Sequence, residues 1–132
     1  MKVFTITSSK RTQFINIDSY IEHAVQESGV DNGIVCVYVP HTTAGITINE
    51  NADPDVLHDI ERTLDKIIPW DGDYRHVEGN SPAHVKASIM GSSVQIIIQN
   101  GKRVLGTWQS VFFCEFDGPR ARKFFVEIVP SI

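Results

Sequence analysis

Apolar and polar side chains recur along this chain with two different periods, and the two periods predict strands and helices. A period of two is typical of strands, whereas recurrence every three or four residues is typical of amphipathic helices. Strands are predicted by alternation, or by short apolar runs rich in β-branched residues, at 2–8, 12–17, 33–39, 46–49, 93–99, 103–106, 110–116 and 123–129. The run at 33–39 is almost continuously apolar, so we interpret it as a central strand buried on both faces.

Capping residues mark where the predicted helices begin and end. Ser19 followed by Glu22 matches a capping box, and Gly29 is suited to end the first helix. Asp53 before a proline predicts the start of the second helix, and the Ser-Pro pair at Ser81 predicts a short third one. The stripe expected to be buried on the first helix is Tyr20, Ile21, Ala24, Val25 and Ser28.

The order of the elements predicts the fold class. The alternating rhythm of parallel βαβ units is not sustained, and Asn100-Gly101 is a strong hairpin signal between two antiparallel strands. We therefore predict an α+β fold: a mostly antiparallel β-sheet, two main helices and one short helix on one face, in a single domain over residues 1–132. The core positions predicted from period alone are Ile34, Val35, Val37, Val39, Ile46, Ile48, Leu57, Ile60, Leu64, Ile96, Ile98, Phe113, Phe125 and Ile128.

Charge and composition narrow the class of protein. A net charge of −4 argues against a general nucleic-acid binder, which needs a basic excess to neutralise phosphates. No apolar stretch approaches the roughly 20 residues of a membrane helix, and the beginning of the chain does not read as a secretory signal. Cys36 and Cys114 each lie in an apolar run, so we interpret both as buried thiols. We expect a cytoplasmic protein without nucleic-acid or membrane partners.

Three of the five histidines fall in predicted loops or at a helix start. His23 and His58 lie on the polar sides of predicted helices and are interpreted as surface residues. His41 follows a predicted strand, His76 lies in a turn-rich segment, and His84 begins the short helix. Three neutral imidazoles with an open position suit Zn²⁺ or another divalent metal. The alternative, an ordinary scatter of polar loop histidines, stays open because no tight motif joins them.

Several polar stretches are candidates for ligand contacts, each with a structural alternative. Thr42 and Thr43 offer hydroxyl and amide groups to an anion, or form a plain turn. The segment 106–110 combines small residues with Trp108, which indicates either a ligand contact or a core or subunit contact. The basic cluster of Arg120, Arg122 and Lys123 is either a solvated turn or a phosphate contact.

The chain as a whole resembles the YjbQ family of small proteins. The segments that carry the resemblance are 41–56 (HTTAGITINENADPDV), 74–76 (YRH), 78–80 (EGN), 83–86 (AHVK), 106–109 (GTWQ) and 114–120 (CEFDGPR). The resemblance implies an α+β fold that assembles as a homotrimer. It also implies that His41, His76 and His84 hold a metal, zinc by preference. Some members of the family are associated with weak thiamine-phosphate synthase activity, so the resemblance makes this activity an expectation here.

The leading hypothesis is therefore a metal-binding enzyme that acts on a phosphorylated small molecule, a thiamine-phosphate-synthase-like transferase. In this hypothesis Glu50 and Gln109 are the catalytic residues and orient the second reactant. The residues assigned to ligand binding are Thr42, Thr43, Asn80, Thr107 and Arg120. Two alternatives are kept: a zinc-dependent hydrolase with Glu50 or Asp53 as proton acceptor, and a non-enzymatic trimeric metal- or ligand-binding module.

Overall fold

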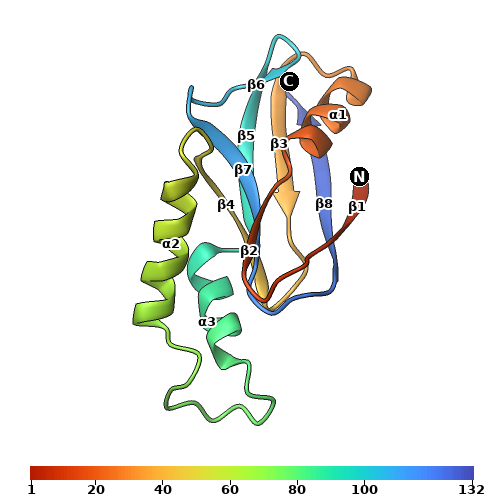
Figure 1. The fold of residues 1–132 in the computed structure, drawn as a ribbon. Coiled ribbons are helices and arrows are strands. Elements are labelled where there is room, and N and C mark those ends of the chain that lie inside the picture. Colours follow the sequence, from red (N-terminus) through yellow and green to blue (C-terminus); the bar gives the residue numbers. More distant parts are fainter.

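Two antiparallel sheets form the body of the computed structural model, which describes residues 1–132 (Figure 1). The larger sheet has the strand order β1-β8-β3-β5-β6 and the smaller one β2-β7-β4. The strands are β1 Lys2–Thr7, β2 Gln13–Asn16, β3 Gly33–Tyr38, β4 Ala44–Glu50, β5 Ser93–Gln99, β6 Lys102–Arg103, β7 Gln109–Glu115 and β8 Ala121–Pro130. The α+β class and the antiparallel pairing are confirmed, but the strands form two sheets rather than one. Alternation along a strand does not say which distant strand it pairs with.

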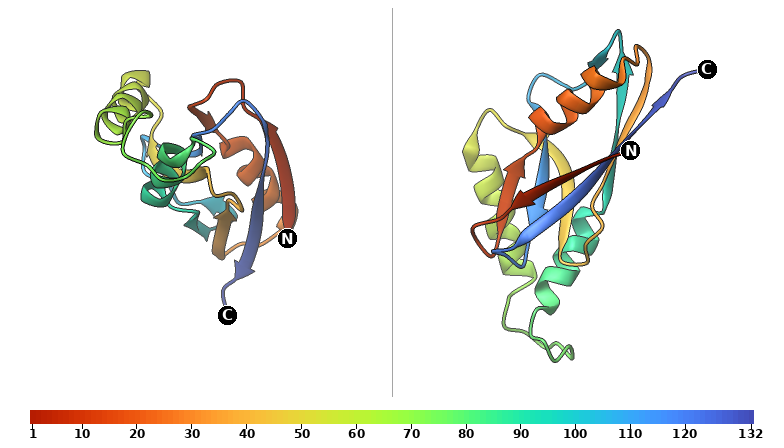
Figure 2. Two further views of the ribbon diagram at one scale, coloured as in Figure 1. Left: turned by 90° about the horizontal axis from the view of Figure 1, so that it is seen from below. Right: turned by 90° about the vertical axis from the view of Figure 1, so that its right-hand side faces the viewer.

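The main core lies between the two sheets and includes the first helix. Helix α1 (Asp18–Ser28) packs against β6, β7 and β8, so it touches strands of both sheets (Figure 2). Its apolar stripe is buried at Ile21, Ala24 and Val25, whereas Ser28 is exposed, contrary to the prediction. The core therefore combines one helix with the inner faces of both sheets.

The other two helices cover the outer face of the small sheet, away from α1 (Figure 1). Helices α2 (Pro54–Ile67) and α3 (Ser81–Met90) contribute to a second apolar cluster with Cys114 of β7 and Phe116, which directly follows β7. The helices thus lie on different sides of the small sheet, and the prediction that they share one face was wrong. None of the three helices is both long and apolar enough to cross a membrane.

The sequence predicts that β3 is buried on both faces, but this prediction is wrong. The strand buried on both faces is β7. In β7 every residue from Ser110 to Glu115 is buried. In β3 burial alternates, and Ile34 and Tyr38 on its outer face are 47% and 45% exposed. The cause is the placement of the helices: α2 and α3 cover the outer face of the small sheet, but no helix covers the outer face of the large one.

Most of the predicted core positions are confirmed. The buried ones are Val35, Val37, Val39, Ile46, Leu64, Ile96, Ile98 and Phe113. Those that are only half-buried are Ile48, Leu57, Ile60, Phe125 and Ile128. In β8 the core-facing side chains are Phe124 and Val126, so the prediction had placed Phe125 on the wrong face.

The helix ends and the hairpin predicted from the sequence are confirmed with one exception. Asp53 accepts the N–H of Asp55 at 2.9 Å and caps α2 as predicted. Gly29 ends α1 with φ of 67°, and Asn100 and Gly101 both adopt positive φ in the hairpin between β5 and β6. The predicted capping box at Ser19 is absent because α1 already begins at Asp18 and has no side-chain cap.

Candidate functional site

A groove of about 490 Å³ lies between α3 and the loop that joins β3 to β4. We call residues 39–43 of that loop the His41 loop. The residues that line the groove are His41, Thr42, Ala44, His84, Ala87, Ser88, Gly91 and Ser92. Helix α3 comes this close to β4 because Gly45 has no side chain: a Cβ there would lie 2.7 Å from the carbonyl oxygen of Gly91. The close packing of α3 on β4 thus brings His84 to the same groove as His41.

The three histidines singled out from the sequence gather in this region. His41 and His84 line the groove, and the rings of His76 and His84 meet edge to face with centroids 5.3 Å apart. They come from three separate segments: a loop after a strand, the turn-rich segment before α3, and the first turns of α3. By contrast, His23 and His58 are exposed on their helices, as predicted.

The ring of His41 is oriented by the backbone of β8. Its Nε2 accepts the N–H of Lys123 at 2.9 Å. Burial lowers the pKa of His41, and the positive charges of Arg122 and Arg120 lower it further. At neutral pH this imidazole is therefore uncharged, with the Nε2 lone pair occupied by the Lys123 amide.

A buried polar network lies directly beneath the His41 loop. The side chain of Arg122 donates from Nε to Glu115 Oε1 at 2.9 Å and from Nη2 to Thr43 Oγ1 at 2.8 Å. Ser8 Oγ donates to the same Glu115 oxygen at 2.7 Å. Burial alone would raise the pKa of Glu115, but hydrogen bonds from Arg122, Ser8 and the Asp117 amide together hold it below its ordinary value. Glu115 and Arg122 therefore form an ion pair inside the protein.

This network was not predicted from the sequence. The sequence predicts that Arg122 belongs to a solvated or phosphate-binding basic cluster, yet its side chain is only 3% exposed. Glu115 and Ser8 are not among the site residues predicted from the sequence. For Arg122 the available signal was the alternation along β8, which places its side chain on the buried face. For Glu115 it was the position within the apolar run of β7, every residue of which from Ser110 on is buried.

Asn80 and Arg120 meet at a shared carboxylate close to the groove. Asn80 Nδ2 donates to Asp117 Oδ2 at 2.9 Å, and Arg120 Nη2 donates to the same oxygen at 3.1 Å. The Oδ1 atom of Asn80 is buried without a hydrogen-bond partner. A buried acceptor that lacks a donor is a point where a ligand or ion can bind. These two predicted ligand-binding residues thus lie on the same side of the molecule as the histidines.

Glu50, Thr107 and Gln109 lie at the opposite end of the small sheet. In the pairing of β4 with β7, Ala44 faces Glu115 and Glu50 faces Gln109. Six residues of strand separate the two ends, which corresponds to roughly 20 Å. Gln109 Oε1 also accepts the N–H of Gly106 at 2.8 Å, so this side chain closes its own turn. Within one chain these residues do not join the histidine groove.

The aromatic residue of the same turn is not part of the core. Trp108 is 63% exposed, whereas its neighbours in β7, Phe112 and Phe113, are buried. Of the two thiols predicted to be buried, Cys114 is buried and Cys36 is only half-buried. Burial raises the pKa of the Cys114 thiol, which makes it unreactive.

The chemistry of the three histidines suits a divalent metal, but their present placement does not. Neutral imidazoles are good ligands, and Asn80 Oδ1 is an unused oxygen nearby. However, no three His, Cys, Asp or Glu side chains are grouped closely enough to hold an ion. In addition, His41 would have to release the Lys123 amide to offer Nε2. The metal site stays a prediction.

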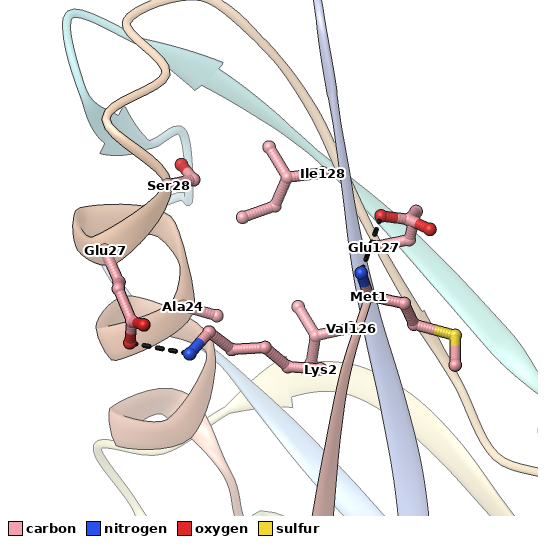
Figure 3. A pocket seen from close by; sticks show the side chains of 8 residues that line it. All are labelled: Met1, Lys2, Ala24, Glu27, Ser28, Val126, Glu127 and Ile128. Atoms are coloured by element: carbon pink, nitrogen blue, oxygen red, sulfur yellow. Dashed lines mark ion pairs between the residues drawn. The ribbon is translucent and has the colours of Figure 1, made fainter.

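A second hollow, of about 220 Å³, lies between α1 and β8 at another part of the surface (Figure 3). Its rim carries an ion pair between Lys2 Nζ and Glu27 at 2.6 Å and another between the Met1 amine and Glu127 at 3.4 Å. The hydrogen bond from Lys2 lowers the pKa of Glu27. The charged groups around this hollow pair with each other, and none of the predicted site residues lines it. The candidate site is therefore the histidine groove.

Comparison with known proteins supports one family over the whole chain. Residues 2–131 match the family model described as "UPF0047 protein YjbQ-like". The chain is 55% identical over 126 residues to the UPF0047 protein MJ1081 of Methanocaldococcus jannaschii, which covers 96% of this chain and 91% of that protein. It is 48% identical over 130 residues to the UPF0047 protein YugU of Bacillus subtilis, which covers 98% of each.

A solved structure shows the same fold. The crystal structure of an uncharacterised conserved YjbQ/UPF0047 protein from Clostridium acetobutylicum superposes with a TM-score of 0.97 at 60% identity. The match covers 98% of this chain and 100% of that one. The comparisons thus establish the family and the fold.

Proposed function

This chain belongs to the UPF0047 YjbQ-like family, and on that premise we propose that it is an enzyme acting on a phosphorylated small molecule in the histidine groove. The observation that carries the proposal is the meeting of His41, Thr42 and His84 in one groove. The positive charge of Arg120 lies close enough to influence His41. Imidazole rings, a hydroxyl and a guanidinium are together suited to bind phosphate oxygens.

The proposed reaction is a thiamine-phosphate-synthase-like transfer. The bond between a pyrimidine methylene carbon and its diphosphate breaks, pyrophosphate leaves with the electron pair, and a thiazole nitrogen bonds to the carbon. Thr42 and Arg120 would hold phosphate oxygens as charge develops on the leaving group. A divalent metal, zinc by preference, would be held by His76 and His84, and by His41 once its ring leaves the Lys123 amide. The metal would supply Lewis-acid neutralisation of the diphosphate charge.

The second reactant would be oriented by Glu50, Thr107 and Gln109, which requires more than one copy of the chain. These residues lie at the far end of the small sheet from His41. We therefore include the homotrimer in the proposal, with this end of one copy completing the groove of another. Two features support assembly: Trp108 is exposed, and apolar residues such as Ile97 and Val129 are exposed on the outer face of the large sheet. Light scattering on the purified protein tests the trimer directly.

The decisive assay combines the purified protein with both thiamine precursors, with and without zinc. Coupling that needs the wild-type groove and is lost in His84→Ala supports the transferase. Turnover of generic phosphoesters without coupling would indicate the zinc-dependent hydrolase instead. Arg103→Met, which breaks a partly buried ion pair with Asp18 away from the proposed site residues, is the matched control for general damage to the fold.

A non-enzymatic binding module is the second candidate, and one observation favours it. Two groups assigned to catalysis or metal binding already have structural partners: Gln109 closes its own turn and His41 accepts a backbone amide. Stoichiometric binding of zinc or phosphate without turnover of any precursor would favour the module. For both candidate functions the proposed location of the protein is the cytoplasm, which cell fractionation tests.

A further inference from the structure

Four of the six buried polar residues of this chain form a single network, and the network ends at the His41 loop. The four are Ser8, Thr43, Glu115 and Arg122. Glu115 belongs to β7 of the small sheet and Arg122 to β8 of the large one. The network therefore connects the two sheets at the point where the loop crosses between them.

Stability does not explain why a charged pair occupies this position. Removing two charges from water carries a large desolvation penalty, and apolar residues of similar size are often as stable or more stable in such places. Glu115 is 0% and Arg122 is 3% exposed, so the penalty applies to both side chains. A role that depends on the geometry of the pair is the better explanation.

The geometry is that of a clamped guanidinium. Nε and Nη2 of Arg122 donate to the two carboxylate oxygens of Glu115, a two-point contact that fixes the plane of the group. Glu115 is itself held by Ser8 Oγ at 2.7 Å and by the Asp117 amide at 3.0 Å. Arg122 Nη2 also donates to Thr43 at both Oγ1, 2.8 Å away, and the carbonyl oxygen, 3.3 Å away.

The next residue of β8 holds the other side of the same loop. Because side chains alternate along a strand, Arg122 points into the core while Lys123 points outward. The Lys123 amide donates to His41 Nε2 at 2.9 Å. Two consecutive residues of β8 thus hold the His41 loop. The Arg122 side chain binds Thr43, and the Lys123 amide binds the ring of His41.

We propose that Arg122, clamped by Glu115, is a positioning residue of the groove, which fixes Thr43 and keeps the His41 ring seated on the Lys123 amide. Arg122 does not touch the ligand. The proposal rests on the proposed function only where it concerns ligand binding, since the position of the His41 ring can be measured without any ligand.

The test compares three variants with the wild-type chain. Glu115→Leu with Arg122→Met replaces the ion pair by an apolar pair of similar size. Arg122→Lys keeps the charge but loses the planar fork that reaches Glu115 and Thr43 together. The matched control is Arg103→Met, which breaks a partly buried ion pair with Asp18 outside the groove.

Three measurements are made on each variant. Urea unfolding reports whether the variant folds. Ring-nitrogen and amide NMR signals of His41 and Lys123 report the seating of the ring. Calorimetric titrations with inorganic pyrophosphate report binding in the groove, and a titration of the wild-type chain with zinc tests the proposed function separately.

We expect the apolar pair to fold with a urea midpoint near that of the wild type, but with shifted or broadened His41 and Lys123 signals. Its affinity for pyrophosphate should fall by about tenfold or more, the usual effect of removing a group that orients a ligand-binding side chain. Arg122→Lys should show the same NMR change and a similar loss. Arg103→Met should leave both signals unchanged and binding within about twofold of wild type.

Wild-type His41 and Lys123 signals in a folded apolar pair would overturn the proposal. If the apolar pair does not fold, the same signals in Arg122→Lys decide the matter. A wild-type protein that binds neither pyrophosphate nor zinc would contradict the proposed function, and the NMR signals would still decide whether Arg122 positions His41.

Discussion

Replacing Gly45 by alanine should push α3 away from β4 and damage the histidine groove. The new Cβ would lie 2.7 Å from the Gly91 carbonyl oxygen and 3.2 Å from Met90 Cβ. Ordinary contacts begin near 3.4 Å, so the carbonyl has to retreat by about 0.7 Å. The same carbonyl accepts the N–H of Ile46 at 3.1 Å, and this hydrogen bond would be stretched by the movement.

The expected loss of stability follows from three contributions. Overpacking of a tight contact costs about 1–3 kcal/mol, and weakening one backbone hydrogen bond costs about 1 kcal/mol. The lower entropy of alanine in the unfolded chain offsets about 0.5–1 kcal/mol. The free energy of unfolding should therefore fall by about 2 kcal/mol, which lowers Tm by about 6–10 °C in a domain of this size.

The assay is urea and thermal unfolding followed by tryptophan fluorescence, with Gly106→Ala as the control. At Gly106 an added Cβ meets only the flexible end of Gln109 at 3.2 Å, so we expect a change within about 0.5 kcal/mol. If Gly45→Ala were as stable as Gly106→Ala, the close approach of α3 to β4 would not be real. The absence of a side chain at Gly45 would then not be what brings His84 to the groove.

Three further predictions concern charged and nucleophilic side chains. Lys86 is buried while its partner Asp65 is 57% exposed, so Lys86→Met should change the free energy of unfolding by less than about 1 kcal/mol. Asp65→Ala leaves the buried ammonium unpaired and should cost about 2–4 kcal/mol, both measured by urea unfolding. The pKa of Glu115 is lower in the folded chain than its ordinary 4.5, so its stabilising contribution is complete above pH 4.5 and is lost as the pH falls through the folded-state value. The difference in urea midpoint between wild type and Glu115→Gln should therefore narrow below pH 4.5. In thiol labelling of the native protein Cys36 should react, while Cys114 should react only after unfolding.

Each of these predictions has a result that would contradict it. Equal losses in Lys86→Met and Asp65→Ala would mean that the ion pair stabilises both partners alike. A difference between wild type and Glu115→Gln that stayed constant from pH 7 to pH 3 would show that the carboxylate is not favoured by folding. Labelling of Cys114 at the rate of Cys36 in the native protein would contradict its burial.

Features set by neighbouring residues were predictable from the sequence. The cap at Asp53, the left-handed end of α1 at Gly29 and the hairpin at Asn100 and Gly101 all depend on a few adjacent residues. The same holds for the exposed side of each helix, where His23 lies as expected. Local sequence specifies these features because their hydrogen bonds and dihedral preferences do not involve distant segments.

The tertiary structure alone decided how distant segments combine into a site. Whether β3 or β7 is buried on both faces depends on where the helices pack, and no period in the sequence contains that information. The register of β4 against β7 brings Gln109 opposite Glu50, at the end of β4 away from His41, although Gln109 and Glu50 are far apart along the chain. The burial of Arg122 beneath the His41 loop likewise depends on contacts between the two sheets, because a side chain's partners across a sheet are set by pairing and not by its neighbours. Histidines could thus be chosen from the sequence, but the groove that joins them is a property of the fold.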